Sequence, residues 1–131
     1  MKNGELGRVY ADNEMIFGEG DKGDIMYVVQ SGKVKITKLT QGGELTLATL
    51  QGGDIFGEMA LFDKLPRSAT ATALGNARVL GIDKKKLFRS ISHDPTLVFK
   101  MIETMSTRIR QLNERLAEQS EAKTEMQKIF Y

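Results

Sequence analysis

The sequence predicts a mainly β fold with C-terminal α structure: a jelly-roll sandwich, or double-stranded β-helix, that carries one short helix and is followed by a long one. Residues 10–83 hold short apolar runs separated by turn signals at intervals of about eight to twelve residues, which is typical of sandwiches and jelly rolls. After residue 94 the apolar residues follow a helical period. We therefore expect a β domain over residues 1–93 and a helical segment over residues 94–131.

Apolar runs and the polar turns between them indicate the individual strands. The predicted strands cover residues 25–30, 33–39, 45–50, 67–74 and 77–82. The predicted turns are Ser31-Gly32, Gln41-Gly42-Gly43, Gly52-Gly53-Asp54 and Gly75-Asn76. Gly18, Gly20 and Gly23 form a G-x-G-x-x-G pattern, but a strand follows them where a dinucleotide site needs a helix. This pattern is therefore interpreted as a turn between strands.

Two helices are predicted after the strands. Asp83 caps a short helix that ends at Ser90, and Asp94-Pro95 supplies an N-cap aspartate followed by a proline in the first helical position. The second helix extends to about Lys128. Its apolar residues, at steps of four and three, form a heptad seam: Val98, Ile102, Met105, Ile109, Leu112 and Leu116. Such a seam favours a parallel homodimer along the helix, and the alternative is that the whole stripe packs onto the sheet.

Composition narrows the classes of function. The net charge of +2 gives no electrostatic reason for nucleic-acid binding by this chain itself. No apolar run approaches the about 20 residues of a membrane span, and neither a signal peptide nor a cysteine is present, so a cytoplasmic location without membrane contact is expected. His93 has no partner histidine or cysteine for a metal, and no nucleophile stands beside a base, so neither a metal site nor an enzyme is expected.

The segment GEMALFDKLPRSAT, residues 57–70, carries the chemistry of a nucleotide site. Arg67 offers a planar fork of N–H donors that can hold two phosphate oxygens. Residues 58–62 can form one helical turn whose N–H groups face the same anion. Glu58 accepts hydrogen bonds when it is ionised, so it suits sugar hydroxyls and not a phosphate. These groups together favour a phosphate ester with a ribose over bare phosphate.

Residues 56–61 and 66–70 resemble the phosphate-binding cassette of the cyclic nucleotide-binding domains, with FGEMAL and PRSAT at the matching positions. Residues 18–36 resemble the early hairpins of that family. The similarity covers about residues 8–115 and is greatest to the sensor domain of the bacterial cAMP receptor protein group. It implies cAMP, and less strongly cGMP, as the ligand, with no other cofactor.

The resemblance also implies roles for single residues. Arg67, Ser68, Met59 and Ala60 would contact the phosphate, and Glu58 and Gly57 would contact the ribose. The family covers the base with its long helix, which implies base or helix-cover roles for Arg108, Leu112 and Asn113, with Arg108 pairing with Glu58 and Asn113 reaching the site from a partner subunit. Ser68 is also explained as a strand serine, Leu112 as a seam residue and Arg108 as a solvated flank.

The function that this resemblance implies is regulatory. Ligand binding would move the helices after Asp83, and the chain would be the sensor part of a transcription regulator or a stand-alone signalling module. No residues remain after Tyr131 for a helix-turn-helix domain. Two alternatives stay open. One is a regulator of the same fold that senses another small molecule, and the other is a dimerising structural adaptor that acts through residues 95–128.

Overall fold

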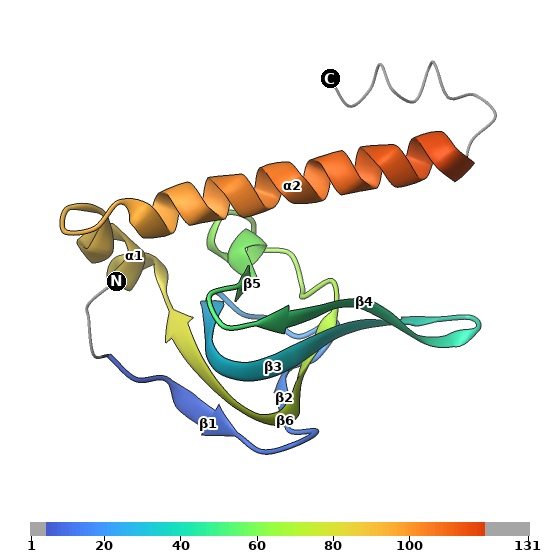
Figure 1. Ribbon diagram of the computed structural model, residues 1–131, viewed down its shortest axis with the longest axis horizontal. Helices are drawn as coiled ribbons and strands as arrows, with labels where there is room; N and C mark the ends of the chain where they lie inside the picture. The colour runs from blue at the N-terminus through green and yellow to red at the C-terminus, as the bar shows by residue number, and fades with distance from the viewer. Residues whose placement is uncertain (1–4, 120–131) are drawn as a thin grey trace. The chain divides into compact units, whose positions relative to one another are not determined.

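The computed structural model describes residues 5–119 (Figure 1). Its strands are β1 (Arg8–Tyr10), β2 (Met15–Phe17), β3 (Met26–Thr40), β4 (Gly43–Gln51), β5 (Ile55–Phe56) and β6 (Thr70–Ile82). Its helices are the 3-10 helix η1 (Glu58–Leu61) and the α-helices α1 (Lys84–Ile91) and α2 (Thr96–Gln119). The chain divides into two compact units, one that ends at Asp94 and one that begins at Pro95.

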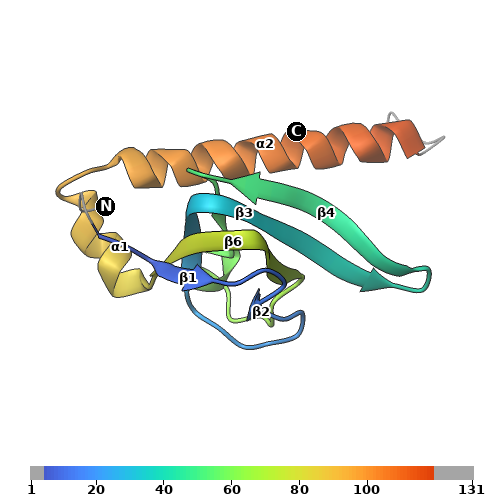
Figure 2. The same ribbon diagram turned by 60° about the horizontal axis from the view of Figure 1, so that its bottom comes forward.

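The first unit is built on one antiparallel sheet. Its strands follow the order β1-β6-β3-β4, while β2 also pairs with β6 and β5 also pairs with β3. The long strands β3 and β6 curve together, and β3 continues with β4 into a projecting hairpin (Figures 1 and 2). This architecture confirms the predicted mainly β jelly-roll fold with a short helix and a C-terminal helix.

Two predicted turns are wrong. Ser31-Gly32 lies inside β3 and Gly75-Asn76 lies inside β6, so each pair of predicted strands is one continuous strand. The register shifts on both sides of Ser31, and Gly32 and Gly75 have left-handed φ angles of 77° and 71°. A Cβ on Gly32 would lie 2.2 Å from the Asn76 carbonyl oxygen. The glycines thus form β-bulges where both strands bend, and a bulge uses the same residue types as a turn.

Alanine and valine side chains, with two aromatic rings, fill the core between the strands. The central buried cluster consists of Tyr10, Val29, Val34, Phe56, Ala71, Ala73, Ala77 and Val79. At its edge the rings of Phe17, Tyr27 and Phe56 pack with centroids 5.4–5.8 Å apart. Since Phe56 is the residue before Gly57, this aromatic group anchors the start of the cassette to the core.

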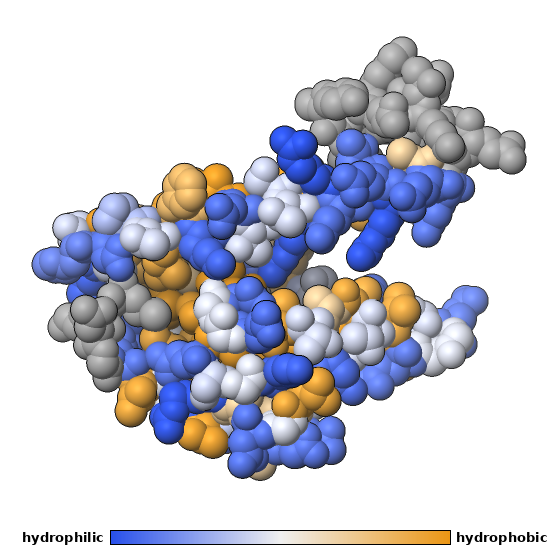
Figure 3. Space-filling model, viewed as in Figure 1, coloured by the Kyte–Doolittle hydropathy of each residue, from blue (hydrophilic) through white to orange (hydrophobic). Residues whose placement is uncertain are grey.

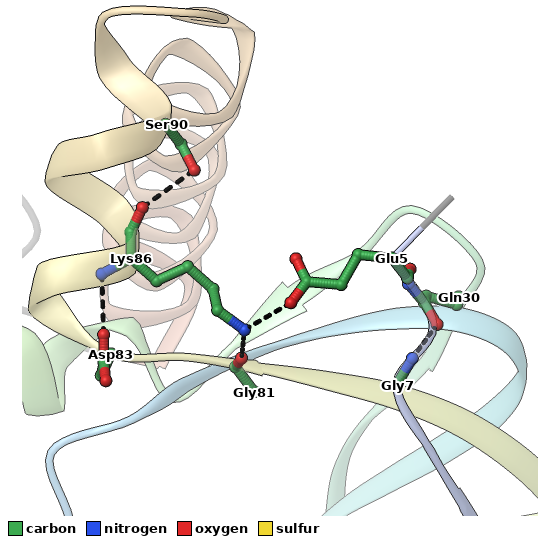
Figure 4. Close-up of polar contacts among 7 residues, drawn as sticks. All are labelled: Glu5, Gly7, Gln30, Gly81, Asp83, Lys86 and Ser90. Carbon is green, nitrogen blue, oxygen red and sulfur yellow. Dashed lines mark hydrogen bonds and ion pairs between the residues drawn. The ribbon is translucent and has the colours of Figure 1, made fainter. Parts of the chain in front are cut away.

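Polar contacts tie α1 to the sheet and to the N-terminal segment (Figure 4). Asp83 is the N-cap, as predicted, and its Oδ1 accepts a hydrogen bond from the Lys86 amide (2.7 Å). Lys86 Nζ donates to Glu5 Oε1 (2.7 Å) and to the Gly81 carbonyl oxygen (3.4 Å). Gln30 accepts from the Gly7 amide and donates to the Glu5 carbonyl, so β3 holds the same segment from the other side.

The second unit contains α2. Its first helical bond runs from the Phe99 amide to the Pro95 carbonyl (3.1 Å), so the helix begins about one residue later than predicted. Ile102, Ile109 and Leu112 of the predicted seam are at least half exposed. The predicted continuation to Lys128 lies outside the described residues. In Figure 3 the visible face of α2 is mainly hydrophilic over its C-terminal half, and no helix among residues 5–119 could cross a membrane.

Candidate functional site

The cassette begins with a backbone conformation that requires glycine. Gly57 has φ 73° and ψ 14°, the left-handed region, and it turns the chain from β5 into η1. The helical turn predicted for residues 58–62 is the four-residue 3-10 helix η1. A Cβ on Gly57 would lie 2.9 Å from Arg67 Nη1, so this glycine also leaves the space that the arginine occupies.

The Arg67 side chain is buried and fixed from several sides. It is 8% exposed, and its guanidinium carbon lies 4.2 Å from the centre of the Phe17 ring. Nη2 donates to the Ile25 carbonyl oxygen (2.8 Å) and Nη1 to the Gly57 carbonyl oxygen (3.3 Å). Nε is buried with no hydrogen-bond partner among the described residues. A buried donor without an acceptor is costly, so this atom marks a place where a ligand acceptor would stabilise the protein.

The loop between β2 and β3 holds Arg67 through its backbone. The Gly20 amide donates to the Arg67 carbonyl and the Arg67 amide donates to the Asp21 carbonyl, both at 2.8 Å. A Cβ on Gly23 would lie 2.6 Å from Arg67 Nη2. The predicted turn between strands is confirmed, but its contact with the site was missed. Because these contacts use amides, carbonyls and an absent side chain, only the glycine spacing could have indicated them.

Glu58 is the second buried charged group of the cassette. It is 2% exposed, in the first position of η1. Carboxylates are almost never buried to this degree without hydrogen bonds or a charged partner. One short segment therefore holds a buried acceptor-only group and a buried donor-only group, which together can bind a ligand with both hydroxyls and negative charge.

The remaining predicted contacts of the cassette are more exposed. Ser68 is exposed, Met59 is 58% exposed and Ala60 is partly buried. The strand predicted from Arg67 begins only at Thr70, so Arg67 and Ser68 lie outside the ladder of β6. This correction matters for function, because Arg67 and Ser68 lie in a loop segment, and binding residues are found in such segments more often than within a sheet.

The three predicted base contacts lie on α2, in the second unit. Arg108 is exposed and Leu112 is 50% exposed. Asn113 is partly buried, and its Oδ1 has no hydrogen-bond partner among residues 5–119. Their roles at the ligand base stay predictions. Within the described part of the chain, no group of three or more histidine, cysteine, aspartate or glutamate residues could hold a metal ion.

Known proteins are similar to this chain in sequence and in fold. The model of the cyclic nucleotide-binding domain family matches residues 7–94. The CRP-like cAMP-activated global transcriptional regulator of Mycobacterium tuberculosis is 35% identical over 104 residues, which cover 79% of this chain and 46% of the regulator. The anaerobic regulatory protein of Bacillus subtilis is 37% identical over 103 residues, covering 77% of this chain and 43% of that protein.

A solved structure is also similar to this chain, in both sequence and fold. The catabolite activator protein of Thermus thermophilus superposes with a TM-score of 0.74 at 34% identity, covering 83% of this chain and 52% of that chain. This chain spans about half the length of the relatives it matches. The resemblance predicted from the cassette is confirmed, and the chain belongs to the cyclic nucleotide-binding domain family.

Proposed function

We propose that this chain binds a cyclic nucleotide, cAMP in preference to cGMP, and acts as a regulatory sensor and not as an enzyme. The observation that carries the proposal is the buried Arg67 guanidinium, whose Nε–H has no acceptor among the described residues. Family membership and cAMP-named relatives support the ligand class. No separate cofactor is needed for this function.

Arg67 is proposed to bind the cyclic phosphate. A guanidinium has five N–H donors. Two nitrogens already donate to the carbonyls of Ile25 and Gly57, which fixes the plane of the group and leaves the Nε–H among the free donors. A phosphate held on this fork gains charge-assisted bonds without further ordering of the side chain. The Ser68 hydroxyl and the backbone at Met59 and Ala60 complete the phosphate contacts.

Glu58 is proposed to bind the ribose. An ionised carboxylate accepts hydrogen bonds from sugar hydroxyls and repels a phosphate, so it also fixes the direction in which the ligand enters. Gly57 has no side chain to obstruct this approach, and its left-handed backbone holds the carbonyl toward Arg67. Together Glu58 and Arg67 would select a nucleotide over either a sugar or a phosphate alone.

The output of the sensor is proposed to run through the segment after the β domain, with residues 1–93 as the sensor domain and 94–131 as the helical segment. The exposed apolar residues Ile102, Ile109 and Leu112 support a parallel homodimer along α2. The bound base would act on this helix through contacts with Arg108, Leu112 and Asn113. By analogy with the transcriptional regulators it matches, the chain would act in the cytoplasm, without membrane or direct nucleic-acid contact.

Isothermal titration tests the ligand. We expect cAMP to bind at micromolar or tighter dissociation constants, cGMP to bind more weakly, and 5′-AMP, which lacks the phosphate ring, to bind much more weakly still. Circular dichroism confirms that the same sample is folded. Absence of heat with both cyclic nucleotides, on folded protein, would overturn the proposed ligand.

The same fold with a different effector is the second candidate. It is favoured by the B. subtilis relative, which is named for anaerobic regulation and not for a nucleotide. The buried Arg67 with its unpaired Nε–H argues against an apolar effector, since such an effector would leave this donor without an acceptor. The alternative of a structural adaptor is tested by removing the helix from residue 95 onward. An adaptor would lose partner binding on this truncation, and nucleotide would have no effect on partner binding by the intact chain.

A further inference from the structure

The strand β6 leaves the sheet just beside the proposed phosphate ligands. Thr37 of β3 and Thr70 of β6 form the last pair between these strands. An uninterrupted register would next place Lys38 opposite Ala69, and then Leu39 opposite Ser68. Instead, the Leu39 amide donates to Oε1 of Glu19, from the loop after β2, at 3.1 Å. A side chain thus replaces the ladder bond at the point where Ser68 leaves the sheet.

Lys38 completes this replacement. Its Nζ donates to the Ser68 carbonyl oxygen (2.9 Å) and contacts Glu19 Oε2 (3.2 Å). The Glu19 amide donates in turn to the Thr70 hydroxyl (2.9 Å). Glu19 and Lys38, called here the clamp, therefore join the end of β3, the loop after β2 and the cassette. The Leu39 amide, followed by Lys38, lowers the pKa of Glu19, so its carboxylate stays ionised at neutral pH.

The contacts of the clamp lie next to the backbone contacts that fix Arg67. The Gly20 amide, next to Glu19, donates to the Arg67 carbonyl, and the Asp21 carbonyl accepts from the Arg67 amide. Arg67 and Ser68 are thus both held outside the ladder: Arg67 by the loop and Ser68 by Lys38. Without the clamp, Ser68 would lose this anchor, and the loop that holds Arg67 would lose its tie to the end of β3.

We propose that Glu19 and Lys38 are positioning residues for ligand binding, which keep Arg67 and Ser68 out of the sheet and oriented toward the phosphate. The role rests on the proposed function, since it concerns the same site. Neither residue needs to touch the ligand. The side chains of Lys38 and Glu19 are 46% and 33% exposed, so water and salt weaken their attraction and the effect is moderate.

The test compares three variants with the wild-type chain. Lys38→Met removes the donor and keeps the length of the side chain, Lys38→Arg restores a donor, and Lys35→Met removes a charge from the same strand. Lys35 is the matched control, because its side chain has no hydrogen bond or ion pair among the described residues and its replacement removes the same single positive charge from β3. Titration with cAMP measures affinity, and thermal unfolding measures stability.

We expect Lys38→Met to weaken cAMP binding about three- to tenfold, and Lys38→Arg to stay within about twofold of wild type. Lys35→Met should also stay within about twofold. In the ligand-free protein, the nitrogen NMR signals of the Ser68 amide and the Arg67 Nε–H should move in Lys38→Met and not in Lys35→Met. Equal losses in both methionine variants, or unmoved Ser68 and Arg67 signals, would overturn the positioning role.

This design separates the two proposals. If the folded wild-type chain binds neither cyclic nucleotide, the proposed ligand fails, and the NMR comparison still decides whether the clamp holds Ser68 and Arg67. If the wild-type chain binds cAMP and Lys38→Met binds it equally well, the clamp is not a positioning device and the proposed ligand stands.

Discussion

Two segments build the site around Arg67 in different ways. The cassette, residues 57–70, contributes side chains of particular types: Glu58 and Arg67 are both buried charged groups. The loop between β2 and β3 contributes only backbone, through Gly20, Asp21 and Ile25. The cassette supplies the chemistry of a ligand site, whereas the loop fixes where that chemistry points.

This difference decides what a sequence reveals. A guanidinium or a carboxylate is tied to one residue type, so a cassette can be recognised from its letters. Every residue has a backbone carbonyl and every residue except proline has an amide N–H, so the only sequence signal for the contacts of the loop is the glycines that allow close approach. Each mutation predicted below tests one kind of contribution, from a side chain or from the backbone.

Removing the Arg67 side chain should have the largest effect. Arg67→Ala should weaken cAMP binding by about 2–5 kcal/mol, because the phosphate charge loses its paired donors. Arg67→Lys should recover only part of this, since a lysine keeps the charge and loses the fork. Titration calorimetry measures the cAMP affinity of both variants, and Arg89→Ala, at an exposed position of α1, is the control. Affinity of Arg67→Ala within about threefold of wild type would remove Arg67 from the site.

The second prediction concerns the ribose. Wild-type protein should prefer cAMP to 2′-deoxy-cAMP by about 1–3 kcal/mol, the range for a hydrogen bond to a charged group. Glu58→Gln should reduce this preference by about 1 kcal/mol, since a neutral acceptor forms a weaker bond. Competition binding with both ligands measures the preference. Glu44→Gln, on the exposed strand β4, serves as the control, and an unchanged preference in Glu58→Gln would exclude the ribose role.

The third prediction separates backbone strain from contact with Arg67. Gly57 and Gly53 both have left-handed backbone, so alanine should lower the free energy of unfolding by about 1–2 kcal/mol at each. Only at Gly57 would the new Cβ meet Arg67, whereas at Gly53 it would find nothing within 4 Å. Gly57→Ala should therefore also weaken cAMP binding by about 1 kcal/mol. Equal binding by the two variants would show that Gly57 does not shape the site.

The smallest effect is a pH dependence in the loop. The Leu39 amide and Lys38 lower the pKa of Glu19 below its ordinary value of 4.5. Ionised Glu19 therefore adds stability above pH 4.5 that is lost as the pH falls through the lower pKa of the folded state. Urea unfolding from pH 7 to pH 3 should show this loss in wild type and less of it in Glu19→Gln. Identical pH profiles would mean that Glu19 is not held by these contacts.

The sequence predicted the fold class, the cap at Asp83 and the helical turn of the cassette, because each depends on residue type and spacing. It failed at Ser31-Gly32 and Gly75-Asn76, where glycines that usually reverse a chain instead bend two paired strands. Whether a glycine turns or bulges depends on what lies opposite it, and that partner is distant in the sequence.

The clamp was missed for a similar reason. Glu19 and Lys38 are ordinary surface residue types, nineteen positions apart, and the clamp exists only because β6 leaves the sheet at Thr70. The roles of Arg108, Leu112 and Asn113 remain predictions, since they depend on where α2 lies when ligand is bound. In both cases the sequence prediction was limited because the contacts join residues that are distant in the sequence, and residue type alone does not indicate which of them meet.

The most direct measurement follows the Arg67 Nε–H signal in nitrogen-labelled protein during titration with cAMP. The variant Arg67→Lys identifies the signal, and 5′-AMP is the control ligand. If the unpartnered donor is the phosphate contact, this signal shifts in step with cAMP binding and moves little with 5′-AMP. Binding of cAMP that leaves the Arg67 signal unchanged, or no binding by the folded chain, would contradict a ligand site centred on Arg67.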